Sequence, residues 1–438
     1  MSMAVPGGLF EAAATALLDP SSSDRLGPEM LGLLRVLDCP LPAVPGAAER
    51  HRALLFRAAA SFVRVFRLAS EVAPGLKFFG AEVAPDAVAA EPGLPVAGVA
   101  GAGLSGLEAF EACTGEGIER LSAVEAVEDR VARQAPPAEV APWLQPLLRS
   151  TAADPGWLAM RRQSDGGTVL VPLDLCLRRA SRNRAFEPPW PLSIGCAASI
   201  SPEGATLHGL LELIERDAVA LWWRGGRRGR PVGLDEAAAA EAAARLALLR
   251  RHRLDRRTWL LDITTDVGVP SVAAVSFGRD GGGFCLGTAA RPDLAGAASA
   301  AIMEMAQSEL AIEVAEAKRR ERGDAALNAA DHVHLRRFRG IHAGRCALVH
   351  PTASGCAAAD LPAGTAAGTL RAVLDRLARL GLEVLTLDLT RARFGVPVMR
   401  VLCPGLEREP SSTAGPRLAA ALAATGGGDC HHGGIALM

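Results

Sequence analysis

Two short stretches repeat the pattern Glu-x-x-Glu-Arg, and their spacing could place carboxylates for metal binding. One covers residues 116–120 and the other residues 212–216, each within an Ala- and Leu-rich stretch that is expected to be helical. Positions i and i+3 lie on one face of a helix, so each copy presents two carboxylates, with an arginine beside the second. If the two helices face each other, four carboxylates converge, and buried like charges raise one another's pKa. Bound magnesium relieves such crowding, and magnesium in proteins commonly accompanies nucleotide phosphates.

A single copy of this pattern carries little weight, because Glu and Arg are helix formers that favour solvated faces. Two copies carry more, because each follows a stretch rich in Gly, Ala and Ser, at residues 98–106 and 193–204. A third helix is expected over residues 294–321, where Glu304 and Gln307 again stand at i and i+3. Three helices thus bring acidic or amide side chains to comparable positions.

Composition excludes several classes of function. The chain has 438 residues, 49% of them hydrophobic, which allows a large core in two lobes or in one large domain with an appendage. Its net charge of -1 gives no indication of nucleic-acid binding. No apolar run reaches transmembrane length and the first 18 residues lack a basic signal-peptide start, so we expect a cytoplasmic protein without a membrane partner. Nine cysteines without a C-x-x-C pair fit reduced thiols.

The lysines exclude one common way of holding a nucleotide. Only Lys77 and Lys318 are present, and neither follows the glycine pattern of a P-loop. Any nucleotide here must therefore be bound by other groups.

The elements that would position these residues follow from hydrophobic patterning. We expect a helical N-terminal extension over residues 1–60, a central domain over residues 61–410 and a C-terminal tail over residues 411–438. The central domain begins with strands and contains the first two helices of interest; the expected elements are strands 62–68, 76–83, 96–99 and 169–177, helices 106–124 and 202–223, and a proline-interrupted helical region 125–165.

A second internal sequence repeat involves strands. Asp262-Ile263-Thr264 precedes Gly268-Val269-Pro270, and Asp388-Leu389-Thr390 precedes Gly395-Val396-Pro397, each time between apolar strands. Both read as strand, turn and strand. Together with the repeated helices they predict an α+β fold with pseudo-symmetric halves, although such short patterns also recur by chance in Val-rich strands.

At this point the motifs resemble those of YcaO-domain proteins. The segments SIGCAA (193–198) and LHGLLELIERDA (207–218) are very similar to the central motif of that family, and ACTGEGIER (112–120) resembles its first motif. The third motif is resembled by AAIMEMAQ (300–307), and the closing strand unit by DLT (388–390), VPVMRV (396–401) and PGL (404–406). The resemblance spans about residues 60–410, with the motifs in the family's order.

The resemblance implies a YcaO-like fold and an ATP- and Mg²⁺-dependent enzyme that phosphorylates a backbone amide oxygen of a ribosomally made precursor peptide. A side chain, sulfide or amine then attacks the activated carbon, giving an azoline, a thioamide or an amidine. Residue by residue, it implies magnesium ligands at Glu116, Glu119, Glu212, Glu215 and Glu304, and nucleotide contacts at Ser193, Arg120, Arg216, Gln307 and Arg400. It also implies the precursor peptide and a TfuA-like or leader-binding protein as partners, and we expect a homodimer.

Two departures from the family pattern affect the expected product. The central motif usually opens Ser-Asn-Gly, whereas this chain has Ser193-Ile194-Gly195, so one polar nucleotide contact is lost or replaced. Azoline-forming members typically end in Pro-x-Pro-x-Pro, whereas this chain ends in residues 430–438 without that pattern. We therefore expect thioamide formation, with an azoline-forming cyclodehydratase or a non-catalytic nucleotide- or peptide-binding subunit as the alternatives.

Overall fold

The computed structural model describes residues 6–19, 27–41, 44–131, 133–149, 151, 153–234, 236, 239–352 and 360–437. Two compact units divide the chain, and neither is continuous in sequence. The first unit contains residues 1–68, 77–210 and 383–403, and the second contains residues 69–76, 211–382 and 404–438. The predicted boundaries at residues 60 and 410 stay predictions.

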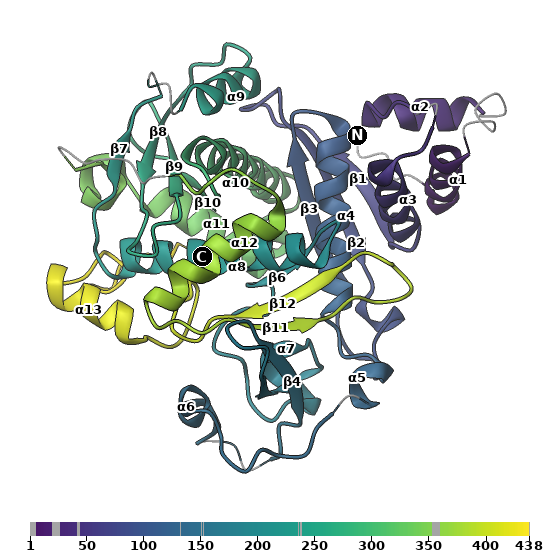
Figure 1. Cartoon of the computed structure of the whole chain (residues 1–438). Coiled ribbons are helices and arrows are strands. Elements are labelled where there is room, and N and C mark those ends of the chain that lie inside the picture. Colours follow the sequence, from purple (N-terminus) through teal and green to yellow (C-terminus); the bar gives the residue numbers. More distant parts are fainter. Residues whose placement is uncertain are drawn as a thin grey trace. The chain divides into compact units, whose positions relative to one another are not determined.

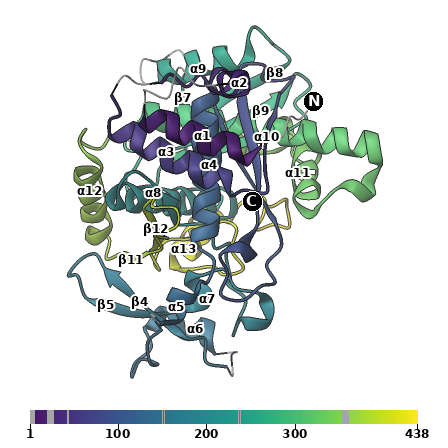
Figure 2. The ribbon, with the colours of Figure 1, turned by 90° about the vertical axis from the view of Figure 1, so that its right-hand side faces the viewer.

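Three helices form the N-terminal part of the first unit: α1 (Gly7–Leu18), α2 (Pro28–Leu37) and α3 (Ala47–Ala60). Helices α1 and α3 lie side by side (Figures 1 and 2). Phe10 of α1 stacks on Phe110 with ring centroids 5.4 Å apart, and Phe56 of α3 lies 4.7 Å from the same ring. Because Phe110 belongs to the next long helix, these rings join the N-terminal helices to the core that carries the first motif.

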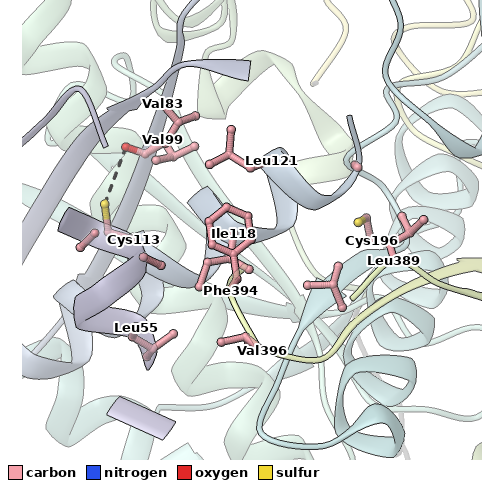
Figure 3. Close-up of a cluster of buried hydrophobic side chains, with 14 of the residues drawn as sticks. Leu55, Val83, Val99, Cys113, Ile118, Leu121, Cys196, Leu389, Phe394 and Val396 are labelled. Atoms are coloured by element: carbon pink, nitrogen blue, oxygen red, sulfur yellow. Dashed lines mark hydrogen bonds between the residues drawn. The ribbon is translucent and has the colours of Figure 1, made fainter. Parts of the chain in front are cut away.

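That next helix, α4 (Gly106–Ser122), packs on an antiparallel sheet. The sheet contains β1 (Arg64–Leu68), β2 (Lys77–Val83) and β3 (Ala97–Gly103), in the order β1-β2-β3. Ser105 begins the helix as its N-cap in a capping box with Glu108. Figure 3 shows the apolar packing around α4, where the Cys113 thiol donates to the Val99 carbonyl.

A second sheet of the first unit combines distant parts of the chain. Its strands are β5 (Thr168–Pro172), β4 (Trp157–Arg162), β11 (Leu385–Asp388), β12 (Val398–Leu402) and β6 (Cys196–Ala198), in that spatial order and all antiparallel. Strand β11 pairs Leu385 with Arg162 on one side and with Leu402 on the other. A segment from late in the sequence therefore forms the middle of this sheet.

The helical region predicted over residues 125–165 is wrong. It holds only the short helices α5 (Val127–Val131) and α6 (Gln145–Leu148) and a 3-10 turn at Pro142–Leu144, and then strand β4. Prolines at 136, 137 and 142 interrupt helix formation, and β4 gains its pairing from β5 and β11, which local propensity does not reveal. The strand predicted over residues 169–177 stops at Pro172, where α7 (Leu173–Cys176) begins.

The second unit is built on another antiparallel sheet, in the order β10-β9-β8-β7. Its strands are β7 (Arg230–Val232), β8 (Arg256–Asp262), β9 (Ser271–Gly278) and β10 (Cys285–Ala290). Helix α10 (Leu294–Arg322) packs against β9 and β10, as Figure 1 shows, and α9 (Ala240–Arg250) packs against α10. Trp222, Trp223 and Phe277 are central to the apolar core of this unit.

Four further helices complete the long elements. Helix α8 (Pro202–Val219) carries the second motif and continues as a π-helical turn over Ala220–Arg224. The others are α11 (Ala329–Gly340), α12 (Ala366–Arg379) and α13 (Pro416–Thr425). The C-terminal segment is packed rather than loose: Leu437 is fully buried, and the Trp223 indole donates to the Ile435 carbonyl at 2.7 Å. Among the helices that the structure describes, none combines the length and apolar character that a membrane-spanning segment requires.

The predicted repeat of the strand–turn–strand unit is confirmed, because both copies make the same hydrogen bonds. The Asp262 carboxylate accepts from the Thr264 amide at 2.9 Å, and the Thr264 hydroxyl accepts from the Ser271 amide at 2.9 Å. Asp388 and Thr390 make the same two bonds, the second to the Val398 amide at 3.1 Å. Each turn also places its glycine, Gly268 or Gly395, at a positive φ. The predicted α+β class with repeated structure is therefore present in both units.

Candidate active site

The first unit contributes the first motif, on the last two turns of α4. Glu116 is exposed, and its Oε2 accepts from the Ala100 amide of β3 at 2.8 Å. Because β3 is an edge strand, this amide points away from its own sheet, and Glu116 satisfies it. Glu116 therefore has a fixed position with one carboxylate oxygen engaged.

Glu119, one turn further along α4, makes the corresponding contact with another sheet. Its Oε1 accepts from the Ala198 amide at 2.7 Å, and Ala198 belongs to the edge strand β6. The adjacent Arg120 is half-buried, and its guanidinium forms no ion pair within the described part of the chain. The first motif thus presents two anchored carboxylates and one arginine that Glu116 attracts without forming an ion pair with it.

Ser193 lies on a turn that an arginine holds in place. Arg400 of β12 is fully buried and donates to the carbonyls of Leu192 at 2.7 Å and Ile194 at 2.8 Å, which flank Ser193. The Ser193 side chain stays exposed, whereas Ile194 is only 3% exposed and points into the protein. These contacts favour a positioning role for Arg400, and its assignment as a phosphate contact stays a prediction.

The second unit contributes the second and third motifs, and Thr288 joins them. The Thr288 hydroxyl donates to Oε1 of Glu215 on α8 at 2.6 Å. The Thr288 amide, on the edge strand β10, donates to Oε2 of Glu304 on α10 at 2.8 Å. Thr288 thereby holds two carboxylates. Its contact with Glu304 repeats the contact of Ala100 with Glu116: in both, an edge-strand amide donates to a glutamate 16 residues later.

Proximity of these carboxylates changes the ionisation of Glu304. Burial, and then the negative charge of Glu215, raise the pKa of Glu304 to about 7, against the opposing effect of Arg216. The Arg216 guanidinium lies 3.7 Å from Oε1 of Glu215 and 3.7 Å from Oε1 of Glu212. Burial alone would lower the pKa of Arg216, but the surrounding glutamates outweigh it and raise this pKa.

A further acidic residue of the second unit belongs to this environment. Glu409 is 2% exposed, its Oε2 lies 3.5 Å from the Arg224 guanidinium, and it acts electrostatically on Arg216. Burial raises the pKa of Glu409 although both arginines oppose the shift. Gln307 lies one turn after Glu304 on α10 and is half-buried.

The carboxylates fit magnesium by their chemistry. Carboxylate oxygens are the protein ligands that Mg²⁺ prefers, and a cation beside Glu215 and Glu304 would remove the repulsion that raises the pKa of Glu304. In the ranges that the structure describes, no three or more His, Cys, Asp or Glu side chains form a ready metal-binding group. Glu116 and Glu119 belong to the first unit and Glu212, Glu215 and Glu304 to the second, so their assignment as magnesium ligands stays a prediction.

The cysteines do not contribute a nucleophile to these groups. Cys113 and Cys196 are 1% and 5% exposed, and burial raises the pKa of the Cys113 thiol well above its ordinary value. The eight cysteines that the structure describes are all free thiols, as the composition predicts.

Thr288 and Glu409 were not recognisable as site residues in the sequence. Thr288 stands in an apolar strand, where its hydroxyl gives no periodic signal, and its link to Glu215 is created by packing. Glu409 follows the closing strand unit in an ordinary acidic stretch. A usable signal existed only for Thr288, which precedes Glu304 by the same 16 residues that separate Ala100 from Glu116.

Comparison with known families and proteins gives the following matches. Residues 100–407 match the family model described as YcaO cyclodehydratase, ATP- and Mg²⁺-binding. An uncharacterised protein in the tfuA 3′ region of Rhizobium leguminosarum bv. trifolii is 30% identical over 227 residues, which is 45% of this chain and 54% of that protein. An uncharacterised protein of Methanothermobacter thermautotrophicus is 32% identical over 219 residues, 49% of this chain and 55% of that protein. The chain thus spans about half the length of these curated relatives.

Solved structures share the fold at low sequence identity. A YcaO protein from Methanopyrus kandleri, bound with AMPPCP and Mg²⁺, is 20% identical with a TM-score of 0.59, and the match covers 82% of this chain and 89% of that one. A heterocyclase in complex with substrate and cofactor is 21% identical with a TM-score of 0.62, over 85% of this chain and 53% of that one. The E. coli microcin synthetase McbBCD complex matches at 13% identity with a TM-score of 0.56, over 78% and 88%.

Proposed function

Because the chain belongs to the YcaO family, we propose that it uses ATP and magnesium to activate backbone amides of a ribosomally synthesised peptide, with a thioamide as the product. Mg²⁺ and ATP would supply the phosphoryl group that turns the amide oxygen into a leaving group. Sulfide then forms the new carbon–sulfur bond as the carbon–oxygen bond breaks and phosphate departs. Phosphoryl transfer depends mainly on positioning and charge neutralisation, which is what clustered carboxylates and arginines can provide.

The observation that carries this proposal is the group around Thr288. Glu215 and Glu304 are held by one residue, and their mutual repulsion is only partly balanced by Arg216. Such a group costs stability unless a cation binds it, so a purely structural role explains it poorly. The chain has no P-loop lysine, so carboxylate-held metal would bind much of the phosphate charge.

The residues keep distinct roles in this proposal. Glu116, Glu119, Glu212, Glu215 and Glu304 are the proposed magnesium ligands. Arg216 stays ionised among the glutamates, because they raise its pKa, and we propose it as a further nucleotide contact. Arg400 holds the turn that exposes Ser193, which we propose, together with Gln307 and Arg120, as a nucleotide contact.

Thioamide formation is favoured by one relative. The Rhizobium protein that shares 30% identity is named after the tfuA region in which it is encoded, and a TfuA-like protein is the partner expected for thioamidation. An azoline product remains the second candidate for an enzyme of this family, because the matching family model is described as a cyclodehydratase. Mass spectrometry of the modified peptide separates them: sulfur replaces oxygen in a thioamide, whereas an azoline loses water.

A non-catalytic subunit is the rival from a different class, and Ile194 favours it. The side chain of Ile194 is buried where the family motif usually has a polar residue, so it offers no contact to a nucleotide. A binding subunit would bind nucleotide or peptide without turnover.

Magnesium-dependent ATP hydrolysis tests enzyme against binding subunit. Glu212→Ala and Glu215→Ala are expected to lower the rate at least about tenfold, the cost typical of losing a metal-site residue. Glu203→Ala is the matched control, because Glu203 is an exposed glutamate on the same helix and should leave the rate unchanged. Hydrolysis that survives both motif substitutions would exclude these residues as ligands, and its absence with every peptide and partner tried would favour the binding subunit.

A further inference from the structure

A pocket of about 260 Å³ in the first unit contains two arginines, Arg178 and Arg184, that the proposed reaction does not use. It lies next to the C-terminal end of α4, and its lining includes Arg120, Arg178 and Arg184. Trp190, Leu192 and several prolines also line it. The pocket is enclosed entirely by residues of this unit.

Arg178 and Arg120 share this pocket, and neither forms an ion pair among the residues that the structure describes. The Nε atom of each is buried without a hydrogen-bond partner, and Glu116 acts on both arginines through its charge alone. The backbone of Arg178 is fixed, because its amide donates to the Ala123 carbonyl at 2.6 Å and its carbonyl accepts from the Glu125 amide at 3.1 Å. Arg178 is therefore held beside α4 without a carboxylate in direct contact with its guanidinium.

The next residue in the chain shows what a structural arginine looks like here. Arg179 donates to the Glu125 carboxylate at 3.0 Å and to the Asp174 carboxylate at 2.8 Å. Two consecutive arginines thus differ in their contacts: Arg179 hydrogen-bonds to two carboxylates, and Arg178 hydrogen-bonds to none among the described residues. Burying a charged side chain without an ion pair lowers the stability of the folded protein. This cost applies to Arg178 but not to Arg179.

The electrostatic environment makes the pocket attractive to an anion. Burial, and then the positive charges of Arg120, Arg400 and Arg184, lower the pKa of Arg178 to about 10. Burial also lowers the pKa of Arg120, although Glu116 acts in the opposite direction. Arg184 does have a partner, an ion pair with the exposed Glu187 at the pocket rim. The net charge that remains in the pocket is positive, and an anion would relieve the repulsion between the arginines.

We propose that this pocket binds an oxyanion through Arg178, beside the proposed nucleotide contact Arg120, and that a carboxylate of the precursor peptide supplies it. An arginine pair suits a carboxylate, since guanidinium groups bind planar oxyanions through paired hydrogen bonds. The wall of proline and tryptophan suits the apolar part of a peptide better than a hydrated ion. Assignment to the precursor peptide rests on the proposed function, whereas the oxyanion site does not. Phosphate is the other source of the same chemistry.

Calorimetric titration of the full chain tests the site with three probes. The first is a blocked tripeptide with a central aspartate, acetyl-glycyl-aspartyl-glycine amide, and the second is its asparagine counterpart. The third is inorganic phosphate. Arg178→Met is expected to weaken binding of the anionic probe at least about tenfold, because hydrogen bonds to a charged group are lost.

Two neighbouring arginines provide the controls. Arg182→Met removes the same charge from an exposed position that does not line the pocket, and it should bind as the wild type does. Arg179→Met breaks the bonds to Glu125 and Asp174 and should lower the unfolding temperature. Arg178→Met should lower it much less, because no ion pair or side-chain hydrogen bond is broken, and the anionic probe should stabilise the wild type alone.

Each outcome decides a specific part of the proposal. Binding of the aspartyl but not the asparaginyl peptide, lost in Arg178→Met, supports the peptide carboxylate. Arg178-dependent binding of phosphate alone supports an oxyanion site and overturns the peptide assignment. Unchanged binding in Arg178→Met, or no binding of any probe to the wild type, overturns the site. None of these measurements requires ATP turnover, so failure of the proposed enzyme activity is recognised separately.

Discussion

Thr288 shows how a single neutral residue organises charge in the second unit. Its hydroxyl and its amide hold Glu215 and Glu304 on two different helices. The carboxylates are therefore positioned before any cation arrives, and the repulsion between them is built into the fold. Burial, and then this repulsion, raise the pKa of Glu304.

Ionisation of Glu304 should make the metal-free protein less stable as the pH rises. Its pKa is about 7 in the folded chain and lies near the ordinary value of 4.5 when the chain is unfolded. The folded state therefore holds the proton more tightly, and stability is lost between about pH 4.5 and pH 7 as the unfolded state releases its proton first. The shift corresponds to at most about 3 kcal/mol.

Glu304→Gln should remove this part of the pH dependence. Urea unfolding without magnesium, measured from pH 5 to pH 8, is expected to show a smaller loss of unfolding free energy in the variant than in the wild type. Glu203→Gln, at an exposed position of α8, should keep the slope of the wild type. Equal slopes for Glu304→Gln and wild type would contradict the raised pKa.

Candidate site residues could be predicted from the sequence only where they recur at a regular helical spacing. The i, i+3 spacing identified the glutamates of α4, α8 and α10, because helical spacing depends on local sequence alone. Thr288 and Arg178 gave no such signal, since their importance depends on which side chains face them in the folded chain. The partner of a buried charge, or its absence, is a tertiary property.

At the scale of elements, two strand–helix pairs depend on a glycine at closest approach. A Cβ added at Gly101 of β3 would lie 2.1 Å from the Cys113 amide nitrogen of α4. A Cβ added at Gly287 of β10 would lie 2.1 Å from the Met305 amide nitrogen of α10. The two contacts carry Glu116 and Glu304 at equivalent places, because a helix packed this closely brings its glutamate to the edge-strand amide.

Gly101→Ala should therefore destabilise the first unit. The new methyl group meets helix backbone, which cannot move aside as a side chain could, so we expect a loss of about 1–3 kcal/mol or more in unfolding free energy. Gly98→Ala is the matched control on the same strand, because nothing lies within 4 Å of its added Cβ. Equilibrium unfolding in urea compares the two, and a similar loss in both variants would contradict the close packing of α4.

The elements themselves were predicted where they are long or flanked by clear turns. Helices α4, α8 and α10 and the strand–turn–strand units appear close to their expected bounds. Strand β4 was missed, and its region was taken as helical, although β5 pairs with it nearby; its other partner, β11, lies more than 200 residues away in sequence. Local propensity cannot report a partner at that distance.

At the scale of the whole molecule, the segment 383–403 belongs to the first unit although the residues before and after it belong to the second. It leaves the second unit, forms strands β11 and β12 of the first unit, and returns. Leu385 pairs with Leu402, so the two ends of the segment lie beside each other as in a hairpin. Hydrophobic patterning predicted both strands but not that they complete a sheet with β4, β5 and β6.

Deleting residues 383–403 and closing the gap with a short Gly-Ser linker should affect the first unit only. Strand β4 would lose β11, and trypsin is expected to cleave after Arg161 and Arg162 of β4 much faster than in the intact chain. Arg256 and Arg257 of β8 provide the internal control, because their pairing with β9 does not involve the deleted segment. Mass spectrometry of the digest identifies the sites, and equal protection of β4 with and without the segment would contradict its central place.

The insertion of β11 between β4 and β12 has a consequence for how the protein is made. A ribosome releases β6, the last of the strands β4, β5 and β6, roughly 190 residues before β11, which at ordinary elongation rates corresponds to about 10 to 40 s. During that interval the nascent chain exposes strand edges that only a later segment can cover, while most of the second unit has already emerged. Slower codons between residues 199 and 384 would lengthen the time for which these edges are exposed to aggregation.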